Sequence, residues 1–106
     1  MTTGPTPAPL SDAQRRFLRG RAHALKPVIQ IGNAGLTEGV ALETERALHD
    51  HELIKVRARV ADRATRDELL AQLAARTGST LVQQIGHVAV LYRPRPSGGK
   101  LLLPDE

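Results

Sequence analysis

The segment from Leu53 to Val60 constrains the fold most strongly, because its side chains alternate in chemistry. The apolar members are Ile54, Val56, Ala58 and Val60, and the basic members between them are Lys55, Arg57 and Arg59. Successive side chains of a strand point to opposite faces, so the segment predicts a strand with one apolar and one basic face. Such a strand belongs in a sheet that helices cover on one side and solvent reaches on the other. Basic side chains on an open face also serve solubility, so this strand alone does not define a binding surface.

Three helices are predicted around that strand. Ser11 and Gln14 form a capping box that opens the first helix, and Pro27 ends it because proline disfavours helical backbone in the preceding residue. Thr37 is the expected N-cap of the second helix. The third helix is expected to open with a capping box of Thr65 and Glu68 and to end at Gly78.

Three further strands complete the expected fold. They are Val28–Ile31, Thr80–Ile85 and His87–Tyr92, the last two forming a hairpin around Gly86. The order α-β-α-β-α-β-β predicts a single compact α/β domain. Its mixed sheet has about four strands, and its helices pack on one face.

The two ends of the chain differ in composition from its middle. Residues 1–9 hold three Thr and three Pro without periodicity, which predicts a disordered leader. Residues 10–94 are the expected domain and residues 95–106 a tail, whose Leu101–Leu103 could dock on the body or on a partner. With no Cys and no apolar run near the roughly 20 residues that span a bilayer, we expect a cytoplasmic protein without membrane contact.

A glycine turn stands between the first strand and the second helix, with the sequence Gly32-Asn33-Ala34-Gly35. A turn of this kind exposes backbone N–H groups at the positive end of a helix dipole, which suits an anionic oxygen. Glycine also lets the backbone approach a ligand closely, because there is no Cβ. The spacing alone is unspecific, and a glycine-capped connection without a ligand would look the same.

Positive charge is concentrated near this turn. The chain has a formal charge of +4 and a pI near 10.3, and basic groups predominate in its first 35 residues. We expect the turn to bind the RNA backbone together with basic residues of the first helix and of the basic strand. These residues are Lys26, Arg15, Arg19, Lys55, Arg57 and Arg59. One Phe, one Tyr and no Trp exclude a protein that stacks several bases on aromatic rings of its sheet.

Catalytic and metal chemistry find little support. His49 and His51 do not share a helical face, and no Cys is present to add ligands. The chain has no recognisable nucleophile motif and no phosphate-binding loop with its lysine. We therefore expect a protein that is not an enzyme and carries no cofactor or metal.

Several segments together resemble the YhbY family of bacterial proteins, which are single CRM domains. They are the runs from Leu25 to Val40, from His51 to Val56 and from Ile85 to Pro94, so the resemblance extends over roughly Leu10 to Pro94. It implies a KH-like RNA-binding domain, similar to the C-terminal domain of translation initiation factor three, that uses its GxxG loop on RNA. It also implies association with precursors of the large ribosomal subunit during assembly; plant relatives act in organelle intron splicing.

The loop departs from the usual pattern in one respect. Its two central residues are Asn33 and Ala34, whereas such loops often carry a basic residue, so charge must come from neighbouring residues. The expected function is a monomeric ribosome assembly factor that binds RNA. A protein-interaction module without direct RNA contact is the alternative, and a small phosphate-ester hydrolase is a weaker third.

Overall fold

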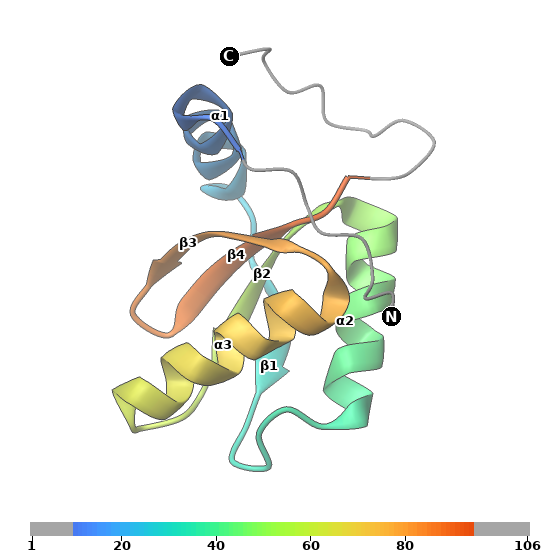
Figure 1. The fold of residues 1–106 in the computed structure, drawn as a ribbon, viewed down its shortest axis with the longest axis vertical. Helices are drawn as coiled ribbons and strands as arrows, with labels where there is room; N and C mark the ends of the chain where they lie inside the picture. Colours follow the sequence, from blue (N-terminus) through green and yellow to red (C-terminus); the bar gives the residue numbers. More distant parts are fainter. Residues whose placement is uncertain (1–9, 95–106) are drawn as a thin grey trace, which may run out of the picture.

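The computed structural model describes residues 10–94, which contain seven helices and strands in the predicted order (Figure 1). The elements are α1 (Asp12–Ala22), β1 (Pro27–Ile31), α2 (Glu38–His51), β2 (Leu53–Ala58), α3 (Arg63–Thr77), β3 (Thr80–Ile85) and β4 (Val88–Tyr92). The expectations of a disordered leader and of a tail that docks fall outside the described residues.

The four strands form one mixed sheet, as predicted, and their order within it is β1-β2-β4-β3. β1 runs parallel to β2, with α2 as the crossover that a parallel pair requires. β4 lies antiparallel between β2 and β3, and its Leu91 faces Ile54 in the register. The alternation is confirmed within β2, since Ile54, Val56 and Ala58 are buried while Arg57 is exposed. The strand is shorter than predicted, because it ends at Ala58 and not at Val60.

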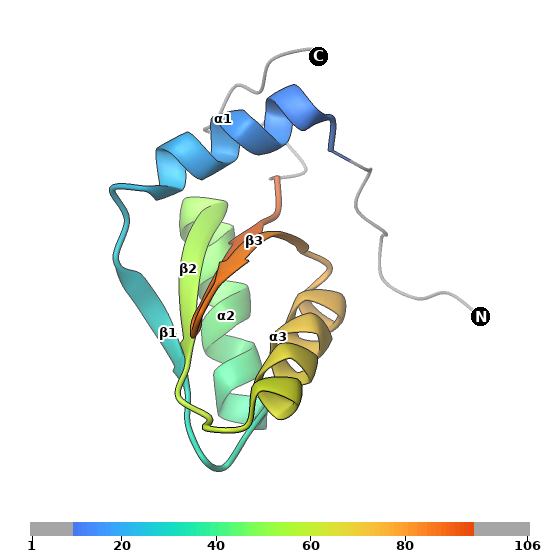
Figure 2. The ribbon, with the colours of Figure 1, turned by 90° about the vertical axis from the view of Figure 1, so that its left-hand side faces the viewer.

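Helices cover both faces of this sheet, which corrects the expectation that they all pack on one. α2 and α3 bury the main core, in which Leu48, Leu70 and Leu73 pack with β2 and β4. α1 instead crosses one end of the opposite face (Figure 2). The physical reason is a second set of apolar strand residues on that face, against which Leu18 and Ala22 of α1 pack: Leu53, Val82, Val90 and Tyr92.

The first helix is shorter than predicted. α1 ends at Ala22, and the backbone N–H of His23 closes it by bonding to the carbonyl oxygens of Arg19 and Gly20. Leu25, which the apolar stripe was expected to include, lies beyond the helix end and is 37% exposed. Lys26 therefore lies in the connection to β1, so it does not share a helix side with Arg15 and Arg19 as expected.

The helix caps agree with the sequence in three cases and differ in one. Ser11 and Gln14 form the predicted capping box, Thr37 caps α2, and Gly78 ends α3 with a φ of 65°. The prediction of a capping box formed by Thr65 and Glu68 is wrong. Asp62 caps α3 instead, because its carboxylate accepts both the N–H and the hydroxyl of Thr65 at 2.8 and 2.6 Å. These bonds lower the pKa of Asp62.

Candidate nucleic-acid interface

The glycine turn lies on the surface, at the lower end of the molecule as drawn in Figure 1. The N–H of Gly35 donates to the carbonyl oxygen of Gly32 at 3.0 Å, which closes a tight turn with Asn33 and Ala34 exposed at its tip. Gly35 has a φ of +77°, which favours glycine, and a Cβ added at Gly32 would meet no atom within 4 Å. Nothing in residues 10–94 shields the approach to Gly32.

Only some of the backbone N–H groups at the turn and at the start of α2 lack a hydrogen-bond partner within residues 10–94. Gly35 uses its N–H inside the turn, and the N–H of Val40 bonds to the Thr37 hydroxyl oxygen at 3.1 Å. Among residues 10–94, the backbone amides of Asn33 and Ala34 have no protein partner, and both residues are exposed. The tip of the turn therefore offers two neighbouring donors to a ligand oxygen.

The acidic residue beside the turn is paired. Glu38 opens α2, and its carboxylate forms an ion pair with Arg76 of α3. A carboxylate at this place would repel a phosphate from the helix N-terminus, and the pairing with Arg76 offsets that repulsion. The negative charge expected to compete with a phosphate is thus compensated within the domain.

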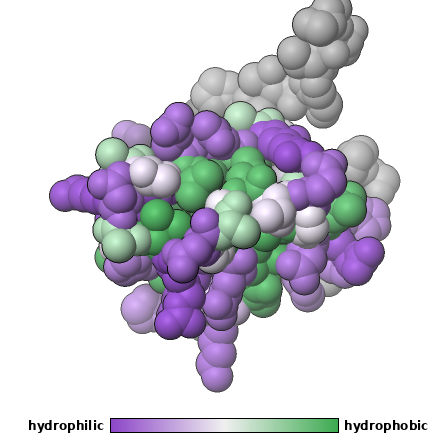
Figure 3. Space-filling view, turned by 90° about the horizontal axis from the view of Figure 1, so that it is seen from below, coloured by the Kyte–Doolittle hydropathy of each residue, from purple (hydrophilic) through white to green (hydrophobic). Residues whose placement is uncertain are grey.

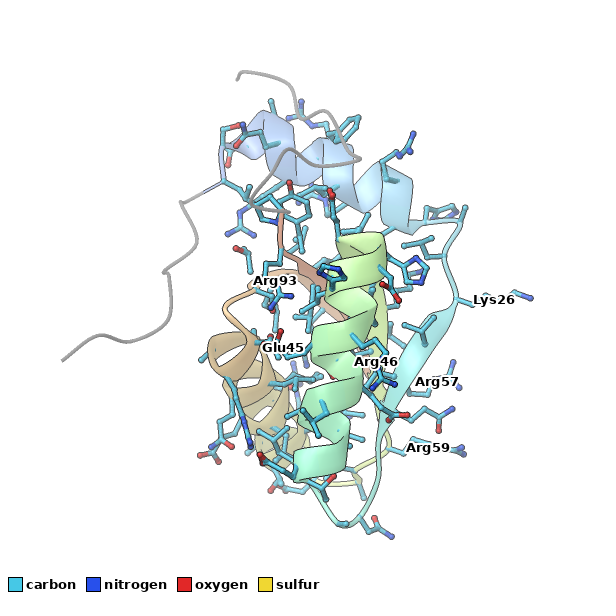
Figure 4. All side chains as sticks on the ribbon, turned by 90° about the vertical axis from the view of Figure 1, so that its right-hand side faces the viewer. Lys26, Glu45, Arg46, Arg57, Arg59 and Arg93 are labelled. Atoms are coloured by element: carbon cyan, nitrogen blue, oxygen red, sulfur yellow. The ribbon has the colours of Figure 1, made fainter. Side chains whose placement is uncertain are left out.

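Arg59 lies directly beside the turn. Its backbone N–H bonds to the carbonyl oxygen of Ile31 at 2.7 Å, one residue before Gly32. Arg57 precedes it on β2, and both residues are exposed. Figure 4 shows Arg57, Arg59 and Lys26 directed away from α2 and α3, along one side of the molecule. Seen from below in Figure 3, hydrophilic side chains surround a smaller apolar area.

A second group of candidate cations meets between α1 and the open face of the sheet. Arg19 from α1 and Lys55 and Arg57 from β2 line the same hollow, which has a volume of about 330 Å³. His23 and Gln83 also line it. Sequence reasoning missed Gln83; its pairing opposite Val90 places it on this face, but strand alternation alone could not show that α1 lies above it.

Two candidate residues lie apart from this group. Arg15 is half-buried, and its guanidinium points to the carbonyl oxygens of Leu81 and Val82 at 3.5 and 3.3 Å, so it anchors α1 to β3. Lys26 lines a different, larger hollow of about 720 Å³, together with Leu25, Val28 and Leu53.

No group of three or more His, Cys, Asp or Glu residues that could hold a metal ion occurs within 10–94. In this part of the chain, every helix is too short or too polar to cross a membrane.

A small mixed sheet with an exposed glycine turn and adjoining basic side chains defines a compact domain of the α/β class. The chain belongs to the CRS1/YhbY (CRM) domain family, whose model matches residues 10–93. This confirms the resemblance of the sequence to that family. The family assignment also places the chain among non-enzymatic domains, as expected.

Relatives match this chain over most of its length. An RNA-binding protein of Haemophilus influenzae is 48% identical over 95 residues, covering 90% of this chain and 95% of the relative. A probable RNA-binding protein of Pseudomonas aeruginosa is 47% identical, covering 88% of this chain and 89% of the relative. The solution structure of a candidate RNA-binding protein from Staphylococcus aureus matches with a TM-score of 0.77 at 36% identity, covering 90% of this chain and 99% of that one.

Proposed function

We propose that this protein binds RNA by its sugar–phosphate backbone and acts as an assembly factor on precursors of the large ribosomal subunit. The observation that carries the binding mode is the exposed Gly32–Gly35 turn with Arg59 fixed beside it. The names of the relatives, which give RNA binding, support the ligand class. The ribosomal partner rests on the family resemblance. The resemblance to initiation factor three stays a prediction.

The chemistry of the turn fits phosphate better than a base. Two adjacent amides, Asn33 and Ala34, can donate to the oxygens of one phosphate, and the open space at Gly32 lets the backbone come close. The central residues carry no charge, so Arg57 and Arg59 supply the electrostatic attraction. Contacts of this kind fix a strand in place and do not read its sequence.

A carboxylate placed in the turn tests the binding mode. Gly32→Asp adds a negative charge where a side chain has room, so the fold should survive while affinity for a fluorescent single-stranded oligouridine falls about tenfold, equivalent to about 1.4 kcal/mol. Arg46→Gln is the matched control, because it changes the net charge equally on the outer face of α2. Equal affinity of Gly32→Asp and the unaltered protein would refute a role for the turn.

The partner is tested in cells. Crosslinking of the tagged protein, followed by sequencing of the attached RNA, should recover ribosomal RNA of the large subunit. The protein should also sediment with precursor particles of that subunit. Gly32→Asp should reduce both the amount of crosslinked RNA and the co-sedimentation, whereas Arg46→Gln should leave them unchanged. Recovery of free protein only, without RNA, would contradict the assignment.

The protein-interaction alternative has one observation in its favour. The hollow of about 720 Å³ near Lys26 is lined by Leu25 and Val28, which are 37% and 56% exposed. Exposed apolar side chains at one place are typical of a protein contact. On that reading, Gly32→Asp would leave both the cellular partner and the biological activity intact.

A further inference from the structure

The hollow between α1 and the sheet combines an apolar floor with a cationic rim. Ala22 and Val90, which are 1% and 3% exposed, form part of its floor, and Arg19, Lys55 and Arg57 stand around it. None of the residues that line it carries a carboxylate. An anionic ligand with one flat apolar portion would match both the floor and the rim.

We propose that this hollow receives one unpaired nucleotide of the bound RNA, an inference that rests on the proposed RNA-binding function. The face of a base would lie on the aliphatic floor, and its phosphate would meet Lys55 and Arg57. The side-chain amide of Gln83 can both donate and accept, so it could pair with a base edge. The nucleotide must be unpaired, because a base inside a duplex has its faces stacked and its edge occupied.

The size of the hollow agrees with this ligand. A volume of about 330 Å³ lies at the lower end of the range of small-molecule sites, roughly 300–1,000 Å³, so it suits one nucleotide and excludes a duplex. The floor of the hollow is aliphatic and has room for one base. It therefore differs from a sheet surface that stacks several bases on aromatic rings, which the composition excludes.

The hollow and the turn lie along the same strand. Arg57 lines the hollow, and Arg59, two residues on, is bonded to the end of β1 at the turn. From Lys55 to Arg59 an extended chain covers about 13 Å. One RNA strand could therefore contact the turn with its backbone and place a neighbouring nucleotide in the hollow.

A pair of RNA hairpins tests the proposal, both closed by the same structured tetraloop, one with a fully paired stem and one with a single bulged uridine in that stem. We expect the unaltered protein to bind the bulged hairpin about tenfold more tightly. Gln83→Glu keeps the side-chain size but adds a carboxylate to the hollow, so it should abolish this preference and leave affinity for the paired hairpin within about twofold. Gln72→Glu, the same change on the exposed surface of α3, should preserve the preference.

A second measurement does not depend on variants. Uridine monophosphate should shift the methyl resonances of Ala22 and Val90 in NMR spectra, whereas ribose 5-phosphate, which lacks the base, should not. Equal binding of the two hairpins, with Gly32→Asp weakening both, would overturn the nucleotide site while the proposed function stood. Binding of neither hairpin would overturn both.

Discussion

The backbone N–H of Arg59 donates to the carbonyl oxygen of Ile31, with 2.7 Å between nitrogen and oxygen. This bond extends the pairing of β1 and β2 by one residue and fixes a cationic residue next to the first glycine of the turn. The pairing of β1 with β2 therefore sets the position of the Arg59 charge at the turn. The two uncharged residues at the tip, Asn33 and Ala34, have no part in it.

The two glycines of the turn should differ in their effect on stability. Gly35→Ala places a side chain at a φ of +77°, so the free energy of unfolding should fall by about 1 kcal/mol or more. Gly32→Ala has open space at its Cβ and should leave stability nearly unchanged. Urea denaturation followed by circular dichroism measures both, and equal losses would contradict the assigned turn geometry.

Affinity for RNA should depend steeply on salt. If about four Lys or Arg side chains contact single-stranded RNA, log K should fall against log salt with a slope near −3. Arg59→Gln should make the slope less negative by about 0.7, whereas Arg46→Gln should not change it. A flat response in a fluorescence-anisotropy titration would exclude backbone electrostatics as the source of affinity.

Arg93 should contribute more to stability than its acidic partner. Its guanidinium donates to the carboxylate of Glu45 at 2.7 Å and to the carbonyl oxygen of Thr77, in the last turn of α3, at 2.8 Å. Arg93→Ala removes these two bonds and a longer one to the backbone carbonyl oxygen of Glu45 at 3.5 Å, so we expect a loss of about 1–3 kcal/mol in the free energy of unfolding. Glu45→Gln alters only a partly exposed ion pair and should cost at most about 1 kcal/mol. Thermal and urea unfolding would compare the two variants. Equal losses of unfolding free energy would argue against a contribution from the bond to Thr77.

The single tyrosine should titrate late. Burial raises the pKa of Tyr92 above its ordinary value of 10.0, and the nearby carboxylate of Glu52 raises it further. Because the folded state holds the phenol proton more tightly, this contribution to stability is complete below pH 10 and is lost as the pH rises through the raised pKa.

The chain has no Trp and one Tyr, so phenolate absorbance reports Tyr92 alone. Glu52→Gln should lower its pKa part of the way, since burial remains. A pKa at or below 10.0 in the folded protein would contradict the buried placement.

The packing of α1 should be separable from that of the main core. Leu18 is fully buried, but it belongs to the cluster on the face of the sheet opposite α2 and α3, apart from Leu70 and Leu73. Leu18→Ala should cost about 2–5 kcal/mol in α1 docking. Hydrogen exchange should then speed up in α1 more than in β2. Uniform acceleration in both elements would show that the two clusters unfold together.

The order of elements, the mixed sheet and most caps could be predicted because local signals specify them. Ser11 with Gln14, Thr37 and Gly78 act within one turn of their own helix. The cap at Asp62 is a local feature too, but the capping-box pattern of Thr65 and Glu68 predicts a different start for α3. The end of α1 could not be predicted, because the apolar pattern of the sequence continues to Leu25 while the helix ends at Ala22.

The meeting of distant cations could not be predicted from spacing. Arg19 meets Lys55 and Arg57 only because α1 folds onto the open face of the sheet. Arg15, on the same helix, faces the carbonyl oxygens of β3 instead. An amphipathic pattern shows which side of a helix is apolar, but not which strands that side will cover.

The strand order also has a consequence for how the protein is made. β4, the last strand within residues 10–94, pairs between β2 and β3, so the inner edge of β2 has no partner until residues 88–92 emerge from the ribosome. The growing polypeptide must carry that open edge from the completion of β2 at Ala58 until β4 follows at residues 88–92. Completion of the sheet is therefore a late event, and premature release of the nascent chain leaves a strand edge open to other chains.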